Sequence, residues 1–238
     1  AEHLKLFAAY YYNRMAQQDD SAIINYKFNA FPEKATVLDL ERSKMDRIRE
    51  PFWQTDTAVS TNSWGYVKKH VYKPVNRLVD DLVDIVSKNG CLLLNIGPKS
   101  DGTIPEHEQQ MLQEIGRWLD VNGEAIYGTR PWKHYGEGPT GTATGHLSEK
   151  KNKAFTAQDI RFTARGDTLY AIVLDWPEGN ELATKSLGSD GGVPITGVTL
   201  LGSDAPIAWE QTDSSLQVRL PMQERKPCEH AFVLKIEQ

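Results

Sequence analysis

The chain is poor in cysteine, which argues against a fold stabilised by disulfide bonds or by a structural zinc ion. Its 238 residues include only Cys91 and Cys228, which lie far apart and show no CxxC or Cys/His spacing. Such a pattern is not typical of a zinc site or of a disulfide framework. The six histidines also lack metal-ligand spacing, so we expect ordinary structural roles for them.

Long apolar runs, basic blocks and internal repeats are also missing. No apolar run approaches the length that spans a bilayer, which predicts no membrane insertion. The 27 Lys+Arg are outnumbered by 32 Asp+Glu, giving a net charge of −5 without a basic block, so we expect no nucleic-acid partner. The 39% hydrophobic and 25% charged residues are typical of a globular protein with one large or two small domains.

The first part of the chain alternates strand and helix patterns. Four runs have the composition of short strands: Ala22–Lys27, Thr36–Glu41, Phe52–Val59 and Cys91–Ile96. The last of these is continuously apolar, which predicts a parallel strand covered on both faces. Apolar residues at helical spacing predict a helix near the beginning, with Leu4, Phe7, Ala8, Tyr11 and Met15 on one face.

Two further helices have clear boundary signals. The first has Pro74 in its first turn, apolar residues at helical spacing from Val75 to Val86, and Gly90 at the position after its end. The second begins with a capping box formed by Thr103 and Glu106 and ends at Gly123. Strands and helices in this order predict an α/β domain with a parallel sheet.

The second part of the chain shows only strand patterns. Residues 135–153 are rich in Gly, Thr and Lys and predict a loop or linker. Beyond them, Asp159–Arg165 and Thr168–Trp176 flank a Gly166–Asp167 turn and predict a hairpin. More strand-like runs follow at Gly197–Leu201, Ile207–Gln211, Leu216–Leu220 and Ala231–Ile236. These runs predict an all-β sandwich.

Functional side chains of a parallel α/β sheet gather at the carboxyl ends of its strands. The residues there are Asn25, Tyr26, Lys27, Asp39, Glu41, Arg42, Gln54, Thr55, Asp56 and Asn95, with Trp64 and Tyr66 on a nearby loop. Carboxylates, amides and tryptophans together suit a sugar, which offers hydroxyl groups and apolar C–H faces. Glycoside hydrolysis usually needs two carboxyl groups. Each residue also has an ordinary structural interpretation, such as a loop ion pair for Glu41 and Arg42 or core packing for Trp64.

Three segments resemble the α-L-fucosidases of glycoside hydrolase family 29. They are Phe7–Asn13 (FAAYYYN), Phe52–Tyr66 (FWQTDTAVSTNSWGY) and Leu82–Trp132, which begins LVDIVSKNGCLLLNIGPKSDGTIPE. The resemblance implies a fold of α/β followed by all-β. Residues 1–132 would form the C-terminal part of a (β/α)8-like catalytic barrel, and residues 133–238 a β-sandwich domain with a Gly/Thr-rich linker at its start.

The resemblance also implies the reaction: hydrolysis of terminal α-L-fucosyl linkages with retention of configuration, through a covalent glycosyl-enzyme. An Asp is the nucleophile, a Glu is the acid/base, and no metal or organic cofactor is needed. The family's nucleophile precedes the FAAYYYN helix, so we expect it upstream of Ala1, on a missing N-terminal half of the barrel. That half and a fucosylated glycan are the implied partners, and a homo-oligomer is left open.

Site residues carry over from the resemblance one by one. Lys27 matches a position where relatives often hold a fucose-binding Arg, and it keeps the charge without the bidentate fork. Gln54 matches a position where several relatives place the acid/base Glu, but an amide cannot act as that acid. Glu41, at a predicted strand end, is therefore the preferred acid/base, and Glu50 the second choice.

The remaining assignments are aromatic or structural. Trp64 is the candidate aromatic wall against the sugar, Tyr66 is a further substrate-binding candidate, and Cys91 is read as structural. A non-catalytic carbohydrate-binding protein that lacks the nucleophile remains the alternative, and another hydrolase on the same scaffold is disfavoured by the length of the match. The family's locations weakly favour a secreted or periplasmic protein over a cytoplasmic one.

Overall fold

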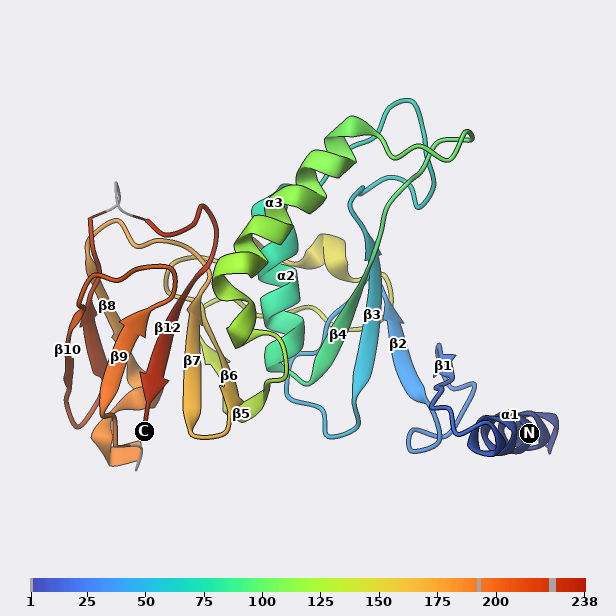
Figure 1. Ribbon diagram of the computed structural model, residues 1–238, viewed down its shortest axis with the longest axis horizontal. Coiled ribbons are helices and arrows are strands. Elements are labelled where there is room, and N and C mark those ends of the chain that lie inside the picture. Colours follow the sequence, from blue (N-terminus) through green and yellow to red (C-terminus); the bar gives the residue numbers. More distant parts are fainter. Residues whose placement is uncertain (1, 192–193, 223–225) are drawn as a thin grey trace.

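The computed structural model describes residues 2–191, 194–222 and 226–238 of the chain. Two β-rich parts lie on either side of a pair of helices, with a third helix at the N-terminal end of the molecule (Figure 1). Within the described ranges, no helix is long and apolar enough to cross a membrane.

A parallel sheet forms the first part, as predicted. Its strands are β1 (Asn25–Tyr26), β2 (Val37–Glu41), β3 (Trp53–Ala58) and β4 (Gly90–Asn95), hydrogen-bonded in the order β1-β2-β3-β4. Because side chains alternate along a strand, the sheet has two distinct faces. Leu40, Trp53 and Leu92 pack on one face against Ile85 of a covering helix.

The other face of this sheet carries mostly polar side chains. They are Asp39, Glu41, Gln54, Asp56, Cys91, Leu93 and Asn95. Leu93 is 55% exposed, so the expectation that Cys91–Ile96 is covered on both faces is wrong for the described residues. The sheet is not closed into a barrel, and it corresponds to the predicted part of one.

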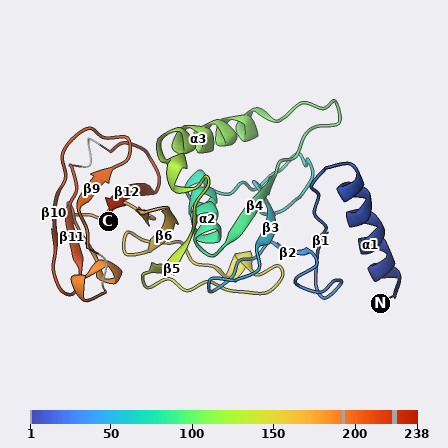
Figure 2. The same cartoon turned by 60° about the horizontal axis from the view of Figure 1, so that its bottom comes forward.

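Helix α2 (Val75–Ser87) lies between the two β-rich parts, and helix α3 (Glu106–Asn122) packs beside it (Figure 2). Ile85 faces the parallel sheet, whereas Val79 and Val83 pack with Trp118 of α3 and with strands of the second part. Burial on several sides explains why the apolar pattern of α2 is so marked.

Glycine is needed after α2 for a reason different from the predicted one. The left-handed residue that follows the helix is Asn89, with φ 70°, and Gly90 is instead the first residue of β4. A Cβ atom on Gly90 would lie 2.5 Å from Trp53 Cε2. The glycine therefore lets the indole pack against the backbone of the neighbouring strand.

The start of α3 also differs from the prediction. Pro105 occupies the N-cap position and no side chain caps the helix. Both the main-chain N–H and the Oγ1 of Thr103 donate to Asp101 Oδ1, at 2.9 and 2.7 Å, which makes a local turn in place of the capping box. The predicted end at Gly123 is confirmed.

Helix α1 (Glu2–Gln17) has the predicted apolar residues but buries none of them. Its side chains Leu6, Phe7 and Tyr10 are exposed, and the helix lies beyond β1 at one end of the molecule (Figure 1). Tyr12 ties it to the rest of the chain by donating from its hydroxyl to the Ala35 carbonyl oxygen at 2.7 Å.

Two antiparallel sheets form the second part, in agreement with the predicted β-sandwich. One has the order β5-β6-β7-β12-β9 and the other the order β10-β11-β8. The strands are β5 (Arg130–Glu137), β6 (Ile160–Arg165), β7 (Thr168–Val173), β8 (Glu181–Thr184), β9 (Gly197–Leu200), β10 (Ala208–Gln211), β11 (Leu216–Arg219) and β12 (Phe232–Glu237). Gly166, with φ 58°, turns the predicted hairpin. Strand β5 crosses residue 132, and the boundary there stays a prediction.

The segment between β5 and β6 does more than connect strands. It returns to the parallel sheet, where Leu147 N–H donates to the Glu41 carbonyl oxygen at 2.8 Å and Glu149 N–H donates to that of Arg42 at 2.9 Å. Residues 138–153 have little regular structure, as predicted, but the prediction of a loop is wrong for residues 135–137, which belong to β5. The segment is docked on the carboxyl end of β2.

A buried ionic cluster holds the second part against α2. The carboxylate of Asp84 is fully buried and accepts hydrogen bonds from Lys88 Nζ at 2.7 Å and from Arg161 Nε of β6 at 2.6 Å. Lys44 Nζ lies 3.6 Å from its other oxygen. Burial alone would raise the pKa of Asp84, but the three cations lower it below its usual range.

Asp80, one turn earlier on α2, is compensated less: Lys44 and Arg161 lower its pKa, but other effects outweigh them. Its Oδ2 accepts a hydrogen bond from Asn76 Nδ2 at 3.0 Å, while its buried Oδ1 has no hydrogen-bond partner among the described residues. Burial, together with the neighbouring Asp81 carboxylate, raises the pKa of Asp80 to about 8.

We predict that Asp80→Asn stabilises the protein at neutral and alkaline pH. Between pH 4 and 8 the unfolded chain releases the Asp80 proton while the folded chain keeps it, so this group lowers wild-type stability as pH rises, by up to roughly 1 kcal/mol per pH unit. The variant should gain over wild type by on the order of a few kcal/mol at pH 8 and by almost nothing at pH 4. Urea denaturation at several pH values measures this, with the exposed Asp204→Asn as a matched control. An equal gain at pH 4 and pH 8 would contradict it.

Candidate functional site

Lys27 is the centre of a charged cluster at the carboxyl ends of β1, β2 and β3. Its Nζ donates to Glu41 Oε2 at 3.0 Å and to Asp56 Oδ2 at 3.0 Å. Asp39 Oδ2 lies 3.4 Å from the same nitrogen. Because the three strands are parallel neighbours, residues that follow or end them meet at one edge of the sheet. The structure thus brings the predicted residues Lys27 and Glu41 into direct contact.

Contacts within the cluster shift the pKa values of Lys27 and Asp39. Partial desolvation would lower the pKa of Lys27, but hydrogen bonds to Asp56 and Glu41 outweigh it and raise this pKa above its usual value. Lys27 therefore stays protonated and positively charged. Burial raises the pKa of Asp39, and the hydrogen bond from Gln54 opposes that rise.

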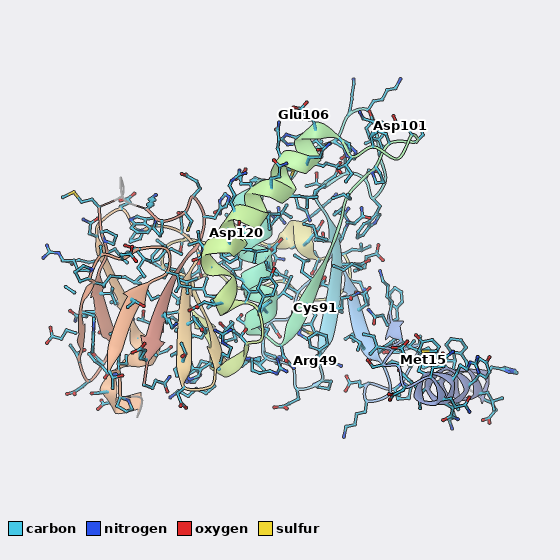
Figure 3. The ribbon with its side chains drawn as sticks, in the orientation of Figure 1. Met15, Arg49, Cys91, Asp101, Glu106 and Asp120 are labelled. Atoms are coloured by element: carbon cyan, nitrogen blue, oxygen red, sulfur yellow. The ribbon has the colours of Figure 1, made fainter. Side chains whose placement is uncertain are left out.

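Gln54 lies in β3 below the cluster. Its Nε2 donates to Asp39 Oδ1 at 3.0 Å, so it orients a carboxylate that faces Lys27. Cys91 lies beside Gln54 in the next strand, and burial raises the pKa of its thiol. Glu50, by contrast, comes before β3, at the amino end of the sheet. Figure 3 shows its neighbour Arg49 far from Asp101, which follows β4 at the carboxyl end.

Trp64 is held against a buried arginine. The Arg42 guanidinium carbon lies 4.3 Å from the centre of the Trp64 ring, and Asn95 Nδ2 donates to the Trp64 carbonyl oxygen at 2.6 Å. Arg42 in turn donates to Glu149 Oε1 at 2.6 Å. Trp64, the predicted aromatic wall, thus packs on Arg42, which Glu149 of the segment after β5 holds in place.

Tyr66, on the same loop, is partly exposed and lies against His70, with ring centres 5.8 Å apart. The loop passes close to the turn after β4, where a Cβ atom on Gly97 would lie 3.1 Å from Tyr66 N. Gly97 N–H donates to the buried Glu108 Oε2 of α3 at 2.8 Å. The loop with both predicted aromatics is therefore packed on a fixed support.

Glu149 joins the support of Trp64 to a second buried cation. Its Oε2 accepts hydrogen bonds from Lys73 Nζ at 2.8 Å and from Thr57 Oγ1 at 2.6 Å. Burial would raise the pKa of Glu149, but these hydrogen bonds and the one from Arg42 lower it. Burial lowers the pKa of Lys73.

Three residues of the site were not selected from the sequence. Asp39 and Asp56 were noted near strand ends but given no role, although both lie on the polar face of the sheet together with Gln54. His146 was expected to be structural, yet its Nδ1 accepts a hydrogen bond from Glu41 N–H at 3.3 Å. Period-two alternation could have indicated Asp56, whereas nothing local in the sequence connects His146 with Glu41.

No group of three or more His, Cys, Asp or Glu side chains suited to a metal ion is present in residues 2–191, 194–222 and 226–238. The Lys27 cluster is instead a set of hydrogen-bond donors and acceptors of both charges. Such a cluster can bind hydroxyl groups and transfer protons at the carboxyl edge of the sheet.

Glu149→Gln should destabilise the protein and loosen the Trp64 loop. The variant leaves Arg42 and the fully buried Lys73 amine without their counter-charge, which costs about 3–5 kcal/mol. Urea denaturation gives the loss, and hydrogen exchange of residues 60–72 reports on the loop. Glu33→Gln is the matched control, because Glu33 forms an exposed ion pair with Arg49 at 3.0 Å and should cost about 1 kcal/mol or less. Equal losses in the two variants would contradict the proposed support.

Comparison with protein families gives two matches along the chain. Residues 1–124 match the model described as "Alpha-L-fucosidase", and residues 152–237 match "Alpha-L-fucosidase C-terminal domain". Among curated proteins, an alpha-L-fucosidase of Branchiostoma floridae is 34% identical over 190 residues, covering 77% of this chain and 38% of the relative. The tissue alpha-L-fucosidase of Homo sapiens is 31% identical over 202 residues, covering 82% of this chain and 39% of the relative.

Solved structures agree with these matches. A structure described as "alpha-L-fucosidase" superposes with a TM-score of 0.78 at 26% identity, covering 100% of this chain and 49% of the other. The Thermotoga maritima alpha-fucosidase in complex with fucose superposes with a TM-score of 0.74 at 27% identity, covering 99% and 48% of the two chains. This chain therefore spans about two fifths of its curated relatives and about half of the solved ones. Its parallel sheet and sandwich are a partial barrel and the β-sandwich that follows it, and the chain belongs to the alpha-L-fucosidase family.

Proposed function

We propose that this protein hydrolyses terminal α-L-fucosyl linkages of fucosylated glycans, with retention of configuration through a covalent glycosyl-enzyme. The observation that best supports this, beside family membership, is the meeting of Lys27, Glu41 and Asp56 at the carboxyl end of a parallel sheet. One cation within hydrogen-bond reach of several carboxylates can orient both the sugar and the groups that transfer protons.

In this proposal each residue has a separate task. Lys27 exchanges one of its carboxylate contacts for a sugar hydroxyl, and its raised pKa keeps it charged while it does so. Glu41 is the acid/base that protonates the leaving oxygen and then activates water. Gln54 orients Asp39 and contributes polar groups beneath the sugar. Trp64 packs against the apolar side of the fucose, with Tyr66 at the edge of the same loop.

The nucleophilic Asp belongs, in this proposal, to the part of the relatives that the 238 residues do not span. Asp56 also accepts a hydrogen bond from Lys27, and it is the alternative candidate for the nucleophile. Retaining enzymes place their two carboxyl groups about 5–5.5 Å apart, a spacing that a shared lysine allows. The stereochemistry of azide products separates the two assignments.

Glu41→Gln, made in a form of the protein that hydrolyses fucosides, should slow natural glycosides by about 10²- to 10⁴-fold and activated aryl fucosides much less. Azide should restore turnover and give the α-fucosyl azide, because it attacks the β-linked intermediate in place of water. Glu50→Gln is the matched control, since this exposed residue lies at the opposite end of the sheet. Full activity of Glu41→Gln, with loss in Glu50→Gln, would reverse the assignment. Rescue of Asp56→Asn as the β-fucosyl azide would make Asp56 the nucleophile.

The isolated 238 residues should not hydrolyse an aryl α-L-fucoside. The described sheet has four strands and an open polar face, and a retaining site needs a nucleophile that we place outside them. The measurement is turnover by a sample whose intact mass matches these residues, beside a sample that includes the remaining part. Turnover by the 238 residues alone would overturn the placement of the nucleophile. Fucose binding without turnover in every form would favour a non-catalytic carbohydrate-binding protein.

A further inference from the structure

Large apolar side chains lie exposed beside the charged cluster. Phe28 directly follows Lys27 and is 68% exposed, and Leu147 directly follows His146 and is 62% exposed. The rings of Phe28 and His146 lie against each other, with centres 4.4 Å apart and planes inclined by 34°. Phe28, His146 and Leu147 together form what we call the apolar rim.

Two of the three rim residues have an unfavourable backbone conformation. Phe28 and Leu147 have φ values of 56° and 61°, in the left-handed region that bulky residues rarely adopt. Arg42, which directly follows Glu41, shares this conformation with φ 45°. The other non-glycine residues with positive φ in the described ranges are Asp19 and Asn89, whose short polar side chains tolerate it better. Strain of this kind persists where the surrounding structure enforces it, and it gathers at functional sites.

The rim is fixed to Glu41 through both main-chain groups of that residue. Glu41 N–H donates to His146 Nδ1 at 3.3 Å, and the Glu41 carbonyl oxygen accepts from Leu147 N–H at 2.8 Å. His146 and Leu147 are therefore tied directly to the backbone of the residue proposed as the acid/base, and Phe28 is joined to them through the His146 ring. In a glycosidase that acid lies between the sugar that is cleaved off and its leaving group.

We propose that the apolar rim binds the leaving-group sugar, the hexose to which the fucose is attached, with the Phe28 ring as its main platform. This inference rests on the proposed function. The C–H face of a pyranose packs well on an aromatic ring, and its hydroxyl edge can reach the polar groups of the Lys27 cluster. Trp64, on a separate loop, packs against the fucose in this proposal. The two aromatic side chains therefore bind the sugars on either side of the glycosidic bond that is broken.

The test compares two substrates that share the fucose but differ in the leaving group. In an active form of the protein, Phe28→Ala should lower kcat/KM for a fucosyl-hexose disaccharide by roughly five- to tenfold, the loss expected for one aromatic contact. It should leave kcat/KM for α-fucosyl fluoride, which has no leaving-group ring, unchanged. Inhibition by free fucose should also be unchanged, and Phe28→Tyr should behave as wild type. Phe52→Ala is the matched control, because Phe52 is 48% exposed at the opposite end of the same sheet.

A second variant keeps the test decisive if Phe28→Ala does not fold. Leu147→Gly removes a rim side chain at a φ that glycine adopts without strain, and it should lower turnover of the disaccharide alone by a few-fold. Equal losses on both substrates, or no loss on the disaccharide, would overturn the rim as a leaving-group site. If the wild-type protein that includes the remaining part of the barrel turns over neither substrate, the proposed function itself fails and the rim proposal with it. If that protein turns over fucosyl fluoride, a failure of the variants to behave as expected contradicts the rim proposal alone.

Discussion

One fully buried carboxylate, Asp84, links the two β-rich parts of the molecule. Its partners come from its own helix, from the loop after β2 and from strand β6, so a single charge joins the parallel sheet, the helix and the sandwich. Removing one partner from such a cluster leaves an uncompensated charge in a place that water does not reach. The relative position of the two β-rich parts is therefore held by charge as well as by apolar packing.

The candidate site depends on that arrangement. Strands β1 to β3 bring Lys27, Glu41 and Asp56 together, but the walls around them come from elsewhere in the chain. Glu149 supports Arg42 beneath Trp64, and His146 caps the main chain of Glu41. Both residues follow β5, the first strand of the sandwich sheet. The second part of the chain is thus a structural component of the site on the first.

The sequence predicted an element correctly where a periodic pattern of apolar residues or a clear turn residue marked it. The helical spacing from Val75 to Val86, the apolar run after it and the Gly166 hairpin each led to the observed element. Strand β5 was missed because a register shift between Pro131 and Gly136 breaks its alternation, and the four-residue β8 has too few positions to show one. The turn after α2 was misread because Asn89, and not glycine, takes the left-handed conformation there.

For the site, the residues at strand ends could be predicted from their positions in the sequence, and Lys27 and Glu41 are in contact as expected for such positions. Partners far along the chain could not be predicted, because Glu41 and His146 are 105 positions apart and no sequence pattern connects them. The interpretation of Gln54 as a departure from a catalytic Glu stays a prediction, and its hydrogen bond to Asp39 could not be read from the sequence.

The return of the chain from β5 to the carboxyl end of β2 also has a consequence for folding kinetics. Contacts such as Arg42–Glu149, 107 positions apart, close a large loop, and the entropy of that closure must be overcome before the contact can stabilise anything. Glu149 follows the last strand of the parallel sheet in the chain, so its contacts with Arg42 and Lys73 can form only after that sheet has been synthesised. The final ordering of the Trp64 loop is then a late event in folding, set by the docking of a segment made after the sheet is complete.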